Sequence, residues 1–377
     1  MDALTTLLRD LVAIDSVNPD LVPGGAGERQ IAGFIAEWLA RAGVEVETDE
    51  PRPGRISVVG RVRGTGGGKS LMLNAHVDTV GVAGMTNPHQ PVIEGNRLYG
   101  RGSYDMKGGL TAILMTASTA VGQGWRGDLL VTAVCDEEYA SIGTESVLKR
   151  WTADAAIVTE PTALDVCVAH KGFVWVDIET QGVASHGSRP DLGVDAIAHM
   201  GRVLVGLEEL NRGLQSRQPH RLLGCASLHA SLVGGGQELS SYPEVCRLSV
   251  ERRTVPGENI TQVEREFADV LAALGAADSK FKASMKTTFV RDPFEVAEDD
   301  AIVSLLHREA ERKLGREVPI VGSTPWMDAA LTSAAGIPTV VFGPGGAGAH
   351  AVVEWVDLEQ VRQCHEILHA VAAEFCR

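Results

Sequence analysis

The feature that most limits the fold of this chain is a series of short apolar runs that alternate with segments of helical periodicity. The runs ISVVGRV, LMLNAHV, LLVTAVC and AAIVTE each have the length of a buried strand. Around them, apolar residues recur at helical spacing near 3–15, 28–42 and 107–122. Strands that alternate with helices in this way predict an α/β sheet covered on both faces.

The pattern changes at about Phe173. Four strand-like runs, FVWVDIET, ASLHASLV, CRLSVERR and FKASMKTTF, are interrupted by helical segments near 193–214 and 259–274. Two helices with four strands that lack the earlier alternation predict a small α+β domain with a four-stranded antiparallel sheet.

After Pro293 the α/β pattern returns, with a helix expected at 299–314, the strand PTVVFG and a last helix at 357–374. The simplest organisation is one α/β domain interrupted by an inserted α+β domain. The predicted boundaries are 1–172 and 292–377 for the α/β domain and 173–291 for the insertion.

Charge and composition exclude some classes of partner. A formal net charge of −15 disfavours nucleic acid and anionic membrane surfaces, which need clustered Lys and Arg. No apolar run approaches the ~20 residues that cross a bilayer, and the N-terminus lacks the pattern of a signal peptide. The six cysteines form no CxxC pair and are expected to be reduced. We therefore predict a cytoplasmic protein.

His76 and Asp78 follow directly on the run LMLNAHV. Alternation in an extended chain puts both side chains on one side, so we expect the Asp78 carboxylate to accept a hydrogen bond from the far nitrogen of His76. Such a contact fixes the tautomer of a metal-bound imidazole and raises its basicity. A turn histidine beside a helix-capping aspartate is the alternative for this pair alone.

Acidic residues stand at two further chain turns. Asp105 lies in a glycine-flanked turn that opens the 107–122 helix, where an ordinary N-cap is the alternative. The run LLVTAVC ends in Asp136, Glu137 and Glu138, for which a solvated acidic turn is the alternative. Adjacent like charges at the end of a buried strand are costly unless cations or donors compensate them. The carboxyl edge of an open α/β sheet is also where ligands bind.

Glu160 leaves the strand-like run AAIVTE, and His350 follows the glycine-rich loop after PTVVFG. Five such positions drawn only from His, Asp and Glu fit a site built where loops converge. Two histidines and three carboxylates without cysteine suit paired Zn²⁺, with Mn²⁺ or Co²⁺ possible. The predicted ligands are His76, Asp105, Glu138, Glu160 and His350.

Seven motifs occur in order along the whole chain: HVDTV, GRGSYDMKGG, DEE, TEPT, GVASHGSRP, ERRTVPGE and GPGGAGAH. Together they resemble the metallopeptidase family of acetylornithine deacetylase, succinyl-diaminopimelate desuccinylase, aminoacylase and glutamate carboxypeptidase. The resemblance implies a zinc-peptidase-like catalytic domain with a mixed sheet, and an inserted domain that acts as a lid and forms a homodimer.

The resemblance also implies roles for the residues that match its motifs. His76 and Glu160 would bind one metal, Glu138 and His350 the other, and Asp105 would bridge the two. Glu137 would be the general base that deprotonates a metal-bridging water, with Asp78 as the partner of His76. Two divalent metal ions per chain, most simply Zn²⁺, are therefore expected.

Two residues of the inserted domain enter only through the resemblance. His186 would reach the partner subunit's site and stabilise the oxyanion, and Arg253 would hold the substrate carboxylate. The alternatives are a loop histidine and a charge at a sheet edge. Where many family members carry an asparagine that contributes to substrate recognition, this chain has Ser240 and Ser241, which weakens the transfer of one member's specificity.

The expected activity is hydrolysis of the amide bond of an N-acyl amino acid, as in acetylornithine deacetylase. Carboxypeptidase-like or dipeptidase-like cleavage of a short peptide and desuccinylation are the alternatives. A non-catalytic protein that kept the fold for binding or assembly is a rival of another class, and the presence of Glu137 beside the full ligand set speaks against it.

Overall fold

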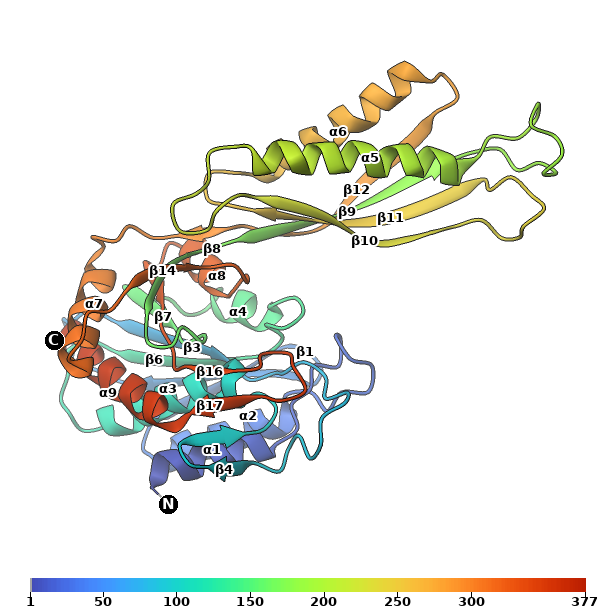
Figure 1. The fold of residues 1–377 in the computed structure, drawn as a ribbon. Coiled ribbons are helices and arrows are strands. Elements are labelled where there is room, and N and C mark those ends of the chain that lie inside the picture. Colours follow the sequence, from blue (N-terminus) through green and yellow to red (C-terminus); the bar gives the residue numbers. More distant parts are fainter. Residues whose placement is uncertain (1) are drawn as a thin grey trace. The chain divides into compact units, whose positions relative to one another are not determined.

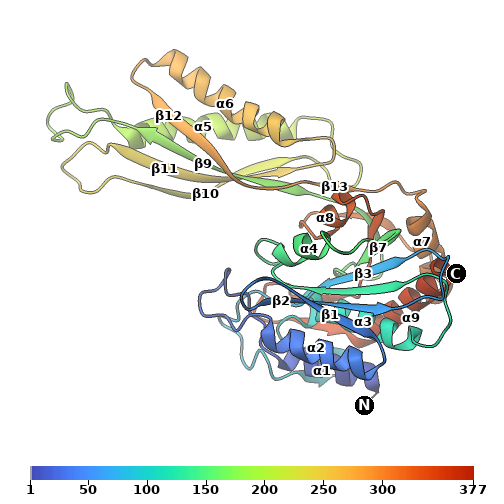
Figure 2. The same cartoon turned by 180° about the vertical axis from the view of Figure 1, so that it is seen from behind.

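The computed structural model describes residues 2–377 and divides into two compact units (Figures 1 and 2). Unit 1 contains the residues up to Val168 together with Val296–Val321 and Met327–Arg377. Unit 2 contains Ala169–Glu295 and the short segment Gly322–Trp326. The predicted insertion, 173–291, lies inside unit 2, whose segment at 322–326 no local sequence pattern indicated.

The main sheet has nine strands in the order β1-β2-β6-β3-β7-β15-β8-β13, with β14 paired to β8. Their bounds are β1 Glu45–Arg52, β2 Arg55–Val62, β3 Leu71–His76, β6 Leu129–Val134, β7 Ala155–Val158, β8 Val166–His170, β13 Phe294–Glu295, β14 Ile320–Ser323 and β15 Thr339–Val341. The β1–β2, β2–β6 and β8–β15 pairs are antiparallel, and the β6–β3, β3–β7 and β7–β15 pairs are parallel. The sheet is therefore mixed, as predicted.

The four parallel strands β6, β3, β7 and β15 form the buried centre of this sheet. Their residues are apolar almost throughout, which is typical of parallel strands covered on both faces. Because their carboxyl ends lie at one edge, the loops that leave them meet there.

Helices cover both faces of the main sheet, as the two opposite views show: α2 and α3 lie on one side and α4 and α8 on the other (Figures 1 and 2). α1 and α9 pack on α3, and α7 packs on α9. The helices of unit 1 are α1 Ala3–Ala13, α2 Arg29–Arg41, α3 Gly108–Ala120, α4 Ile142–Val147, α7 Ala301–Leu314, α8 Ala329–Ala334 and α9 Leu358–Phe375. α3 is buried over most of its surface, which explains its apolar sequence.

A second, small sheet of unit 1 was not predicted. It has the order β16-β17-β5-β4, with β4 Val92–Glu94, β5 Arg97–Tyr99, β16 Gly346–Ala347 and β17 Trp355–Asp357. It joins the segment before Asp105 to the segment around His350, which lie far apart in the sequence.

Unit 2 is a four-stranded antiparallel sheet in the order β10-β11-β9-β12 with two helices, as predicted. Its elements are β9 Gly172–Gln181, α5 Ala196–Gln215, β10 Ser227–Gly235, β11 Val245–Thr254, α6 Ile260–Ala277 and β12 Lys282–Arg291. Alternate residues of β9, such as Val174, Val176 and Ile178, are buried in one apolar core with residues of α5 and α6. The helices thus cover one face of this sheet and leave the other face without a helix (Figure 1).

In the described part of the chain, no helix has both the length and the apolar character that a bilayer crossing needs.

Candidate metal centre

His76 is the last residue of β3 and is buried at the carboxyl edge of the main sheet. Its Nδ1 lies 2.9 Å from the backbone carbonyl oxygen of Asp78 and 3.7 Å from the Asp78 carboxylate. The predicted acceptor is therefore wrong, because the backbone carbonyl takes the hydrogen bond. A carbonyl can only accept, so Nδ1 carries the proton and the lone pair of Nε2 is left for a metal.

The Asp78 carboxylate is used differently. It accepts hydrogen bonds from the backbone N–H of Glu137 at 3.1 Å and of Glu138 at 3.2 Å. It also accepts one from Asn18 Nδ2 at 2.8 Å. Asp78 therefore fixes the start of the acidic loop after β6. Its carboxylate does not cap a helix, and it does not accept the hydrogen bond of His76.

Asp105 presents its two carboxylate oxygens to two different histidines. Oδ1 lies 3.3 Å from His76 Nε2, and Oδ2 lies 3.5 Å from His350 Nε2. Asp105 does not cap α3, because the N-cap position of that helix is Lys107. One carboxylate oxygen thus faces each histidine, which is the arrangement that a ligand bridging two cations needs.

Glu354, which was not predicted as a site residue, holds the loop of Asp105 in place. Its buried carboxylate accepts hydrogen bonds from the backbone N–H of Gly102, Tyr104 and Asp105 at 2.9–3.0 Å. Arg101 pairs with the same carboxylate at 2.7 Å. The one signal in the sequence was a lone acid inside the apolar run AVVEWV.

Glu138 and His350 form the other side of the centre. Glu138 Oε2 lies 3.0 Å from His350 Nε2. Hydrogen bonds from the His350 imidazolium to Asp105 and Glu138 raise the pKa of His350 to about 10, because both acceptors stabilise the charged ring. His350 has a φ of 60°, in the left-handed region that non-glycine residues adopt at a cost and that recurs at functional sites.

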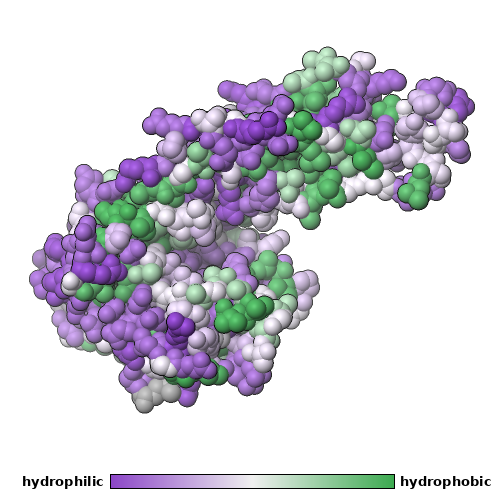
Figure 3. All heavy atoms as spheres, in the orientation of Figure 1, coloured by the Kyte–Doolittle hydropathy of each residue, from purple (hydrophilic) through white to green (hydrophobic). Residues whose placement is uncertain are grey.

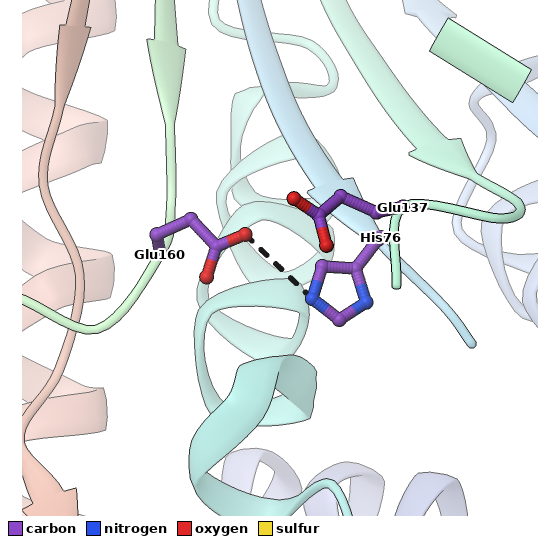
Figure 4. A group of neighbouring side chains, drawn as sticks. All are labelled: His76, Glu137 and Glu160. Carbon is purple, nitrogen blue, oxygen red and sulfur yellow. Dashed lines mark ion pairs between the residues drawn. The ribbon is translucent and has the colours of Figure 1, made fainter. Parts of the chain in front are cut away.

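Glu160 and Glu137 lie on the side of His76. Figure 4 shows the side chains of His76, Glu137 and Glu160 pointing toward one another, and Glu160 Oε1 is 3.6 Å from His76 Nε2. One ligand atom from each of these three lies within 4.8 Å of the others, and the same holds for His76, Asp105 and Glu138. Glu137 is predicted to be a base and not a ligand, but its carboxylate lies close enough to His76 and Glu160 to share a metal ion with them.

Burial controls the charge state of this cluster. It raises the pKa of Glu137 and of Glu160 well above the usual range, and each is raised further by nearby carboxylates. Burial also raises the pKa of Glu138, with Asp105 as the next cause. Divalent cations would replace the protons of this cluster, because they compensate crowded carboxylates and bind imidazole in its neutral form. The donor set therefore fits borderline metals such as Zn²⁺.

A buried ionic network supports the acidic loop from behind. Asn18 Nδ2 donates to Asp136 at 2.9 Å as well as to Asp78. Arg55 pairs with Asp136 at 2.6 Å and with Glu28 at 2.8 Å. Asp136 is therefore neither a ligand nor a solvated turn residue: it anchors the loop whose next two residues enter the centre.

Asp328 is a further buried acid that sequence reasoning missed. Burial raises its pKa to about 6, although the Thr144 hydroxyl donates to its Oδ2 at 2.5 Å. It belongs to the same charge cluster, since it contributes to the raised pKa of Glu137 and Glu160.

His186 and Arg253 lie in unit 2. Nδ1 of His186 accepts a hydrogen bond from the backbone N–H of Ser188 at 3.2 Å, and the Ser188 hydroxyl oxygen lies 2.8 Å from the same nitrogen. Nδ1 is thus unprotonated in the neutral ring, and the exposed Nε2 is a donor. Arg253 is half-buried and bonds to Glu251 at 2.7 Å, whereas its neighbour Arg252 is fully buried in ion pairs with Glu258 and Glu266.

Comparison with known proteins agrees with this arrangement. Residues 72–374 match the sequence profile of peptidase family M20/M25/M40. Acetylornithine deacetylase of Myxococcus xanthus is 28% identical, with 100% of this chain and 98% of that protein covered. N-formyl-4-amino-5-aminomethyl-2-methylpyrimidine deformylase of Bacillus subtilis is also 28% identical, with coverage of 94% and 91%.

Solved structures share the fold. The aminopeptidase PepT of Bacillus cereus superposes with a TM-score of 0.80 at 18% identity, covering 99% of this chain and 98% of that one. A dinuclear metal-binding peptidase of family M20 from Bacillus subtilis gives a TM-score of 0.77 at 17% identity, covering 99% and 97%. The predicted fold class and family are confirmed: this chain is a metallohydrolase that belongs to peptidase family M20/M25/M40.

Proposed function

We propose that this protein hydrolyses the amide bond of N-acyl amino acids with two divalent metal ions. The observation that carries the proposal is the Asp105 carboxylate, whose two oxygens face His76 and His350 separately. His76, Asp105 and Glu160 would hold one metal, and Asp105, Glu138 and His350 would hold the other. Support for a pair of ions also comes from the dinuclear peptidase of the same fold.

Glu137 is the general base in this proposal. When bound, the two cations lower the pKa of a water molecule and polarise the scissile carbonyl. The Glu137 carboxylate would take the proton of the attacking water and return it to the leaving amine. Burial raises the pKa of Glu137, which makes its carboxylate a stronger base than a solvated one.

The residues of unit 2 complete the proposal. The Nε2–H of His186 is a donor suited to the oxyanion that forms when water attacks the amide. Arg253 binds the substrate carboxylate through a charge-assisted pair. Asp78, through the two backbone amides that it holds, keeps Glu137 and Glu138 in place.

The choice of an N-acyl amino acid as substrate rests on two relatives that remove an acyl group, an acetylornithine deacetylase and a formylaminopyrimidine deformylase. Peptidase activity is the second candidate, because the family and the solved neighbours are named as peptidases.

A hydrolysis screen separates these activities. The purified protein, loaded with Zn²⁺, Mn²⁺ or Co²⁺, is offered N-acetyl, N-formyl and N-succinyl amino acids beside dipeptides, and the released amine is measured. We expect an N-acyl amino acid to be cleaved fastest. Faster cleavage of dipeptides would establish the peptidase instead, and no turnover with any compound would favour a non-catalytic protein.

We also propose a homodimer formed through unit 2. β10 is an edge strand, and two of its apolar residues, Leu232 and Val233, are 72% and 63% exposed. Leu239 in the following loop is fully exposed as well. Figure 3 shows such apolar groups, in green, on the surface of this unit. A long apolar edge strand left open is an aggregation risk that pairing with a second copy removes.

A further inference from the structure

Arg101 is a buried arginine whose guanidinium contacts three segments of unit 1 that are distant in the sequence. Its Nε donates to the backbone carbonyl oxygen of Gly81 at 3.1 Å, and its Nη1 donates to the Glu354 carboxylate at 2.7 Å. Its Nη2 donates to the backbone carbonyl oxygen of Ala351 at 3.0 Å. The residue is only 3% exposed, and a buried charge is tolerated where its donors are paired in this way.

The segments that Arg101 joins are those that carry proposed metal ligands. One contact lies in the loop that leaves β3 after His76, and another lies at the residue that follows His350. Arg101 itself stands four residues before Asp105. One side chain thus connects the backbone around three ligands that come from different parts of the chain.

Glu354 completes this connection. Its Oε2 accepts hydrogen bonds from Arg101 and from the backbone N–H of Gly102, and its Oε1 accepts those of Tyr104 and Asp105. Each carboxylate oxygen therefore receives two donors, which is the full number of its lone pairs. We call Arg101 and Glu354 together the clasp.

The two sides of the metal centre depend on the clasp to different degrees. His76 is 1% exposed and ends a central strand of the main sheet, which fixes it independently. In contrast, residues 349–353 are all exposed, and the side chain of His350 is 58% exposed. An exposed loop with little packing is held mainly by its backbone hydrogen bonds. The bond from Arg101 to Ala351 therefore controls the place of His350.

We propose that Arg101 and Glu354 are positioning residues that hold His350 opposite Asp105 and thereby create the metal site of Asp105, Glu138 and His350. The inference rests on the proposed function and adds an asymmetry to it. Binding of the ion at His350 depends on the clasp, whereas binding of the ion at His76 depends on the sheet. Partners of this outer kind typically change metal affinity by ~10–100-fold.

Titration of the metal-free, full-length protein with Zn²⁺, followed by calorimetry, tests this proposal. Wild-type protein should bind two ions. Arg101→Lys should bind one ion like the wild type and the other ~10–100-fold more weakly, because a single ammonium group cannot reach three acceptors that lie in different directions.

A second variant alters the other member of the clasp. Glu354→Gln places an amide NH₂ group where two donors need an acceptor, so it should weaken the same ion. His350→Ala identifies which ion is affected. In that background, Arg101→Lys should hardly change the binding of the ion that remains.

Glu309→Gln is the matched control. Glu309 is also a buried acid of unit 1, and its carboxylate accepts hydrogen bonds from Arg312 at 2.7 and 3.0 Å. It lies within α7, which bears no proposed ligand, so this variant should bind both ions like the wild type. A merely structural role of the clasp would lower the Tm of the metal-free protein and leave both affinities unchanged.

The outcomes separate the inference from the proposed function. If the wild type binds two ions, then equal weakening of both ions in Arg101→Lys and Glu354→Gln, or no weakening of either, would overturn the inference alone. Circular dichroism shows whether each variant is folded, and Arg101→Lys decides if Glu354→Gln is not. A wild-type protein that binds fewer than two ions would contradict the proposed function, and the inference with it.

Discussion

At the scale of single residues, the centre depends on which way neighbouring carboxylates point. Glu137 and Glu138 are adjacent in the sequence, yet Glu138 faces His350 and Glu137 faces His76 and Glu160. Both residues lie in a turn after β6, where successive side chains point in different directions, so a pair of acids can supply one metal ligand and one base. Because Glu137 lies so close to the ligand groups, it must be tested whether it is a base or a metal ligand.

Glu137→Gln should keep both metals and lose turnover. The substitution preserves size and removes the proton acceptor, which typically contributes ~10²–10⁴-fold in rate. Metal content and kcat of the purified variant check this expectation.

Glu138→Gln is the matched variant, since it makes the same change one residue along the chain. It replaces an anionic ligand by a poorer neutral one and should lower metal occupancy. If Glu137→Gln loses metal and Glu138→Gln keeps it, the two roles are exchanged. If both variants keep near-wild-type metal content and turnover, Glu137 and Glu138 are only residues of a solvated acidic turn.

At the scale of helices and strands, the centre is built from the carboxyl ends of parallel strands. His76 ends β3, Glu138 follows β6 and Glu160 follows β7, and these residues are brought together because the three strands are neighbours in the sheet. This part of the site was predictable, because apolar runs mark the strands and the residue after each run marks its end.

The rest of the site was not predictable from local pattern. Glu354 bonds to backbone amides about 250 positions earlier, and the short strands β5 and β17 that bring the two segments together have only three residues each. The true acceptor of His76 was missed for a related reason. Alternation places the Asp78 side chain beside the imidazole but cannot show that the backbone amides of Glu137 and Glu138 bind it more closely.

Asp78→Ala should loosen the loop after β6. Without the carboxylate, the amides of Glu137 and Glu138 lose their acceptor, and metal affinity should fall by ~10–100-fold as for other outer partners of ligands. Titration with Zn²⁺ followed by calorimetry measures the change.

Asp154→Ala is the control for this prediction. Asp154 also accepts two hydrogen bonds, from the backbone N–H and hydroxyl of Ser70 at 2.7 and 2.8 Å, but it is exposed and away from the ligands. Its variant should bind metal like the wild type. Equal metal affinity in Asp78→Ala and wild type would show that the loop holds its shape without that carboxylate.

In the molecule as a whole, the proposed functional residues are divided between the two units. Unit 1 supplies all five proposed ligands and the base, whereas His186 and Arg253 belong to unit 2. If unit 2 forms the homodimer, His186 can serve the site of the other subunit.

Mixing two inactive proteins tests action across the dimer. His186→Ala and Glu137→Ala chains should each be inactive, and a heterodimer should contain one site with an intact base and an intact histidine. Activity should therefore return on mixing, measured as amine release after subunit exchange. If the mixture exchanges subunits but stays inactive, His186 acts in the site of its own chain.

The central claim is that Asp105 joins two metal ions in one hydrolytic centre. Elemental analysis of active wild-type, Asp105→Ala and His350→Ala proteins tests it most directly, with circular dichroism to show that each variant is folded. We expect two divalent ions per wild-type chain, loss at both sites in Asp105→Ala and loss of chiefly one ion in His350→Ala. Active wild-type protein with a single ion or none, or a folded Asp105→Ala protein that retains two, would contradict it.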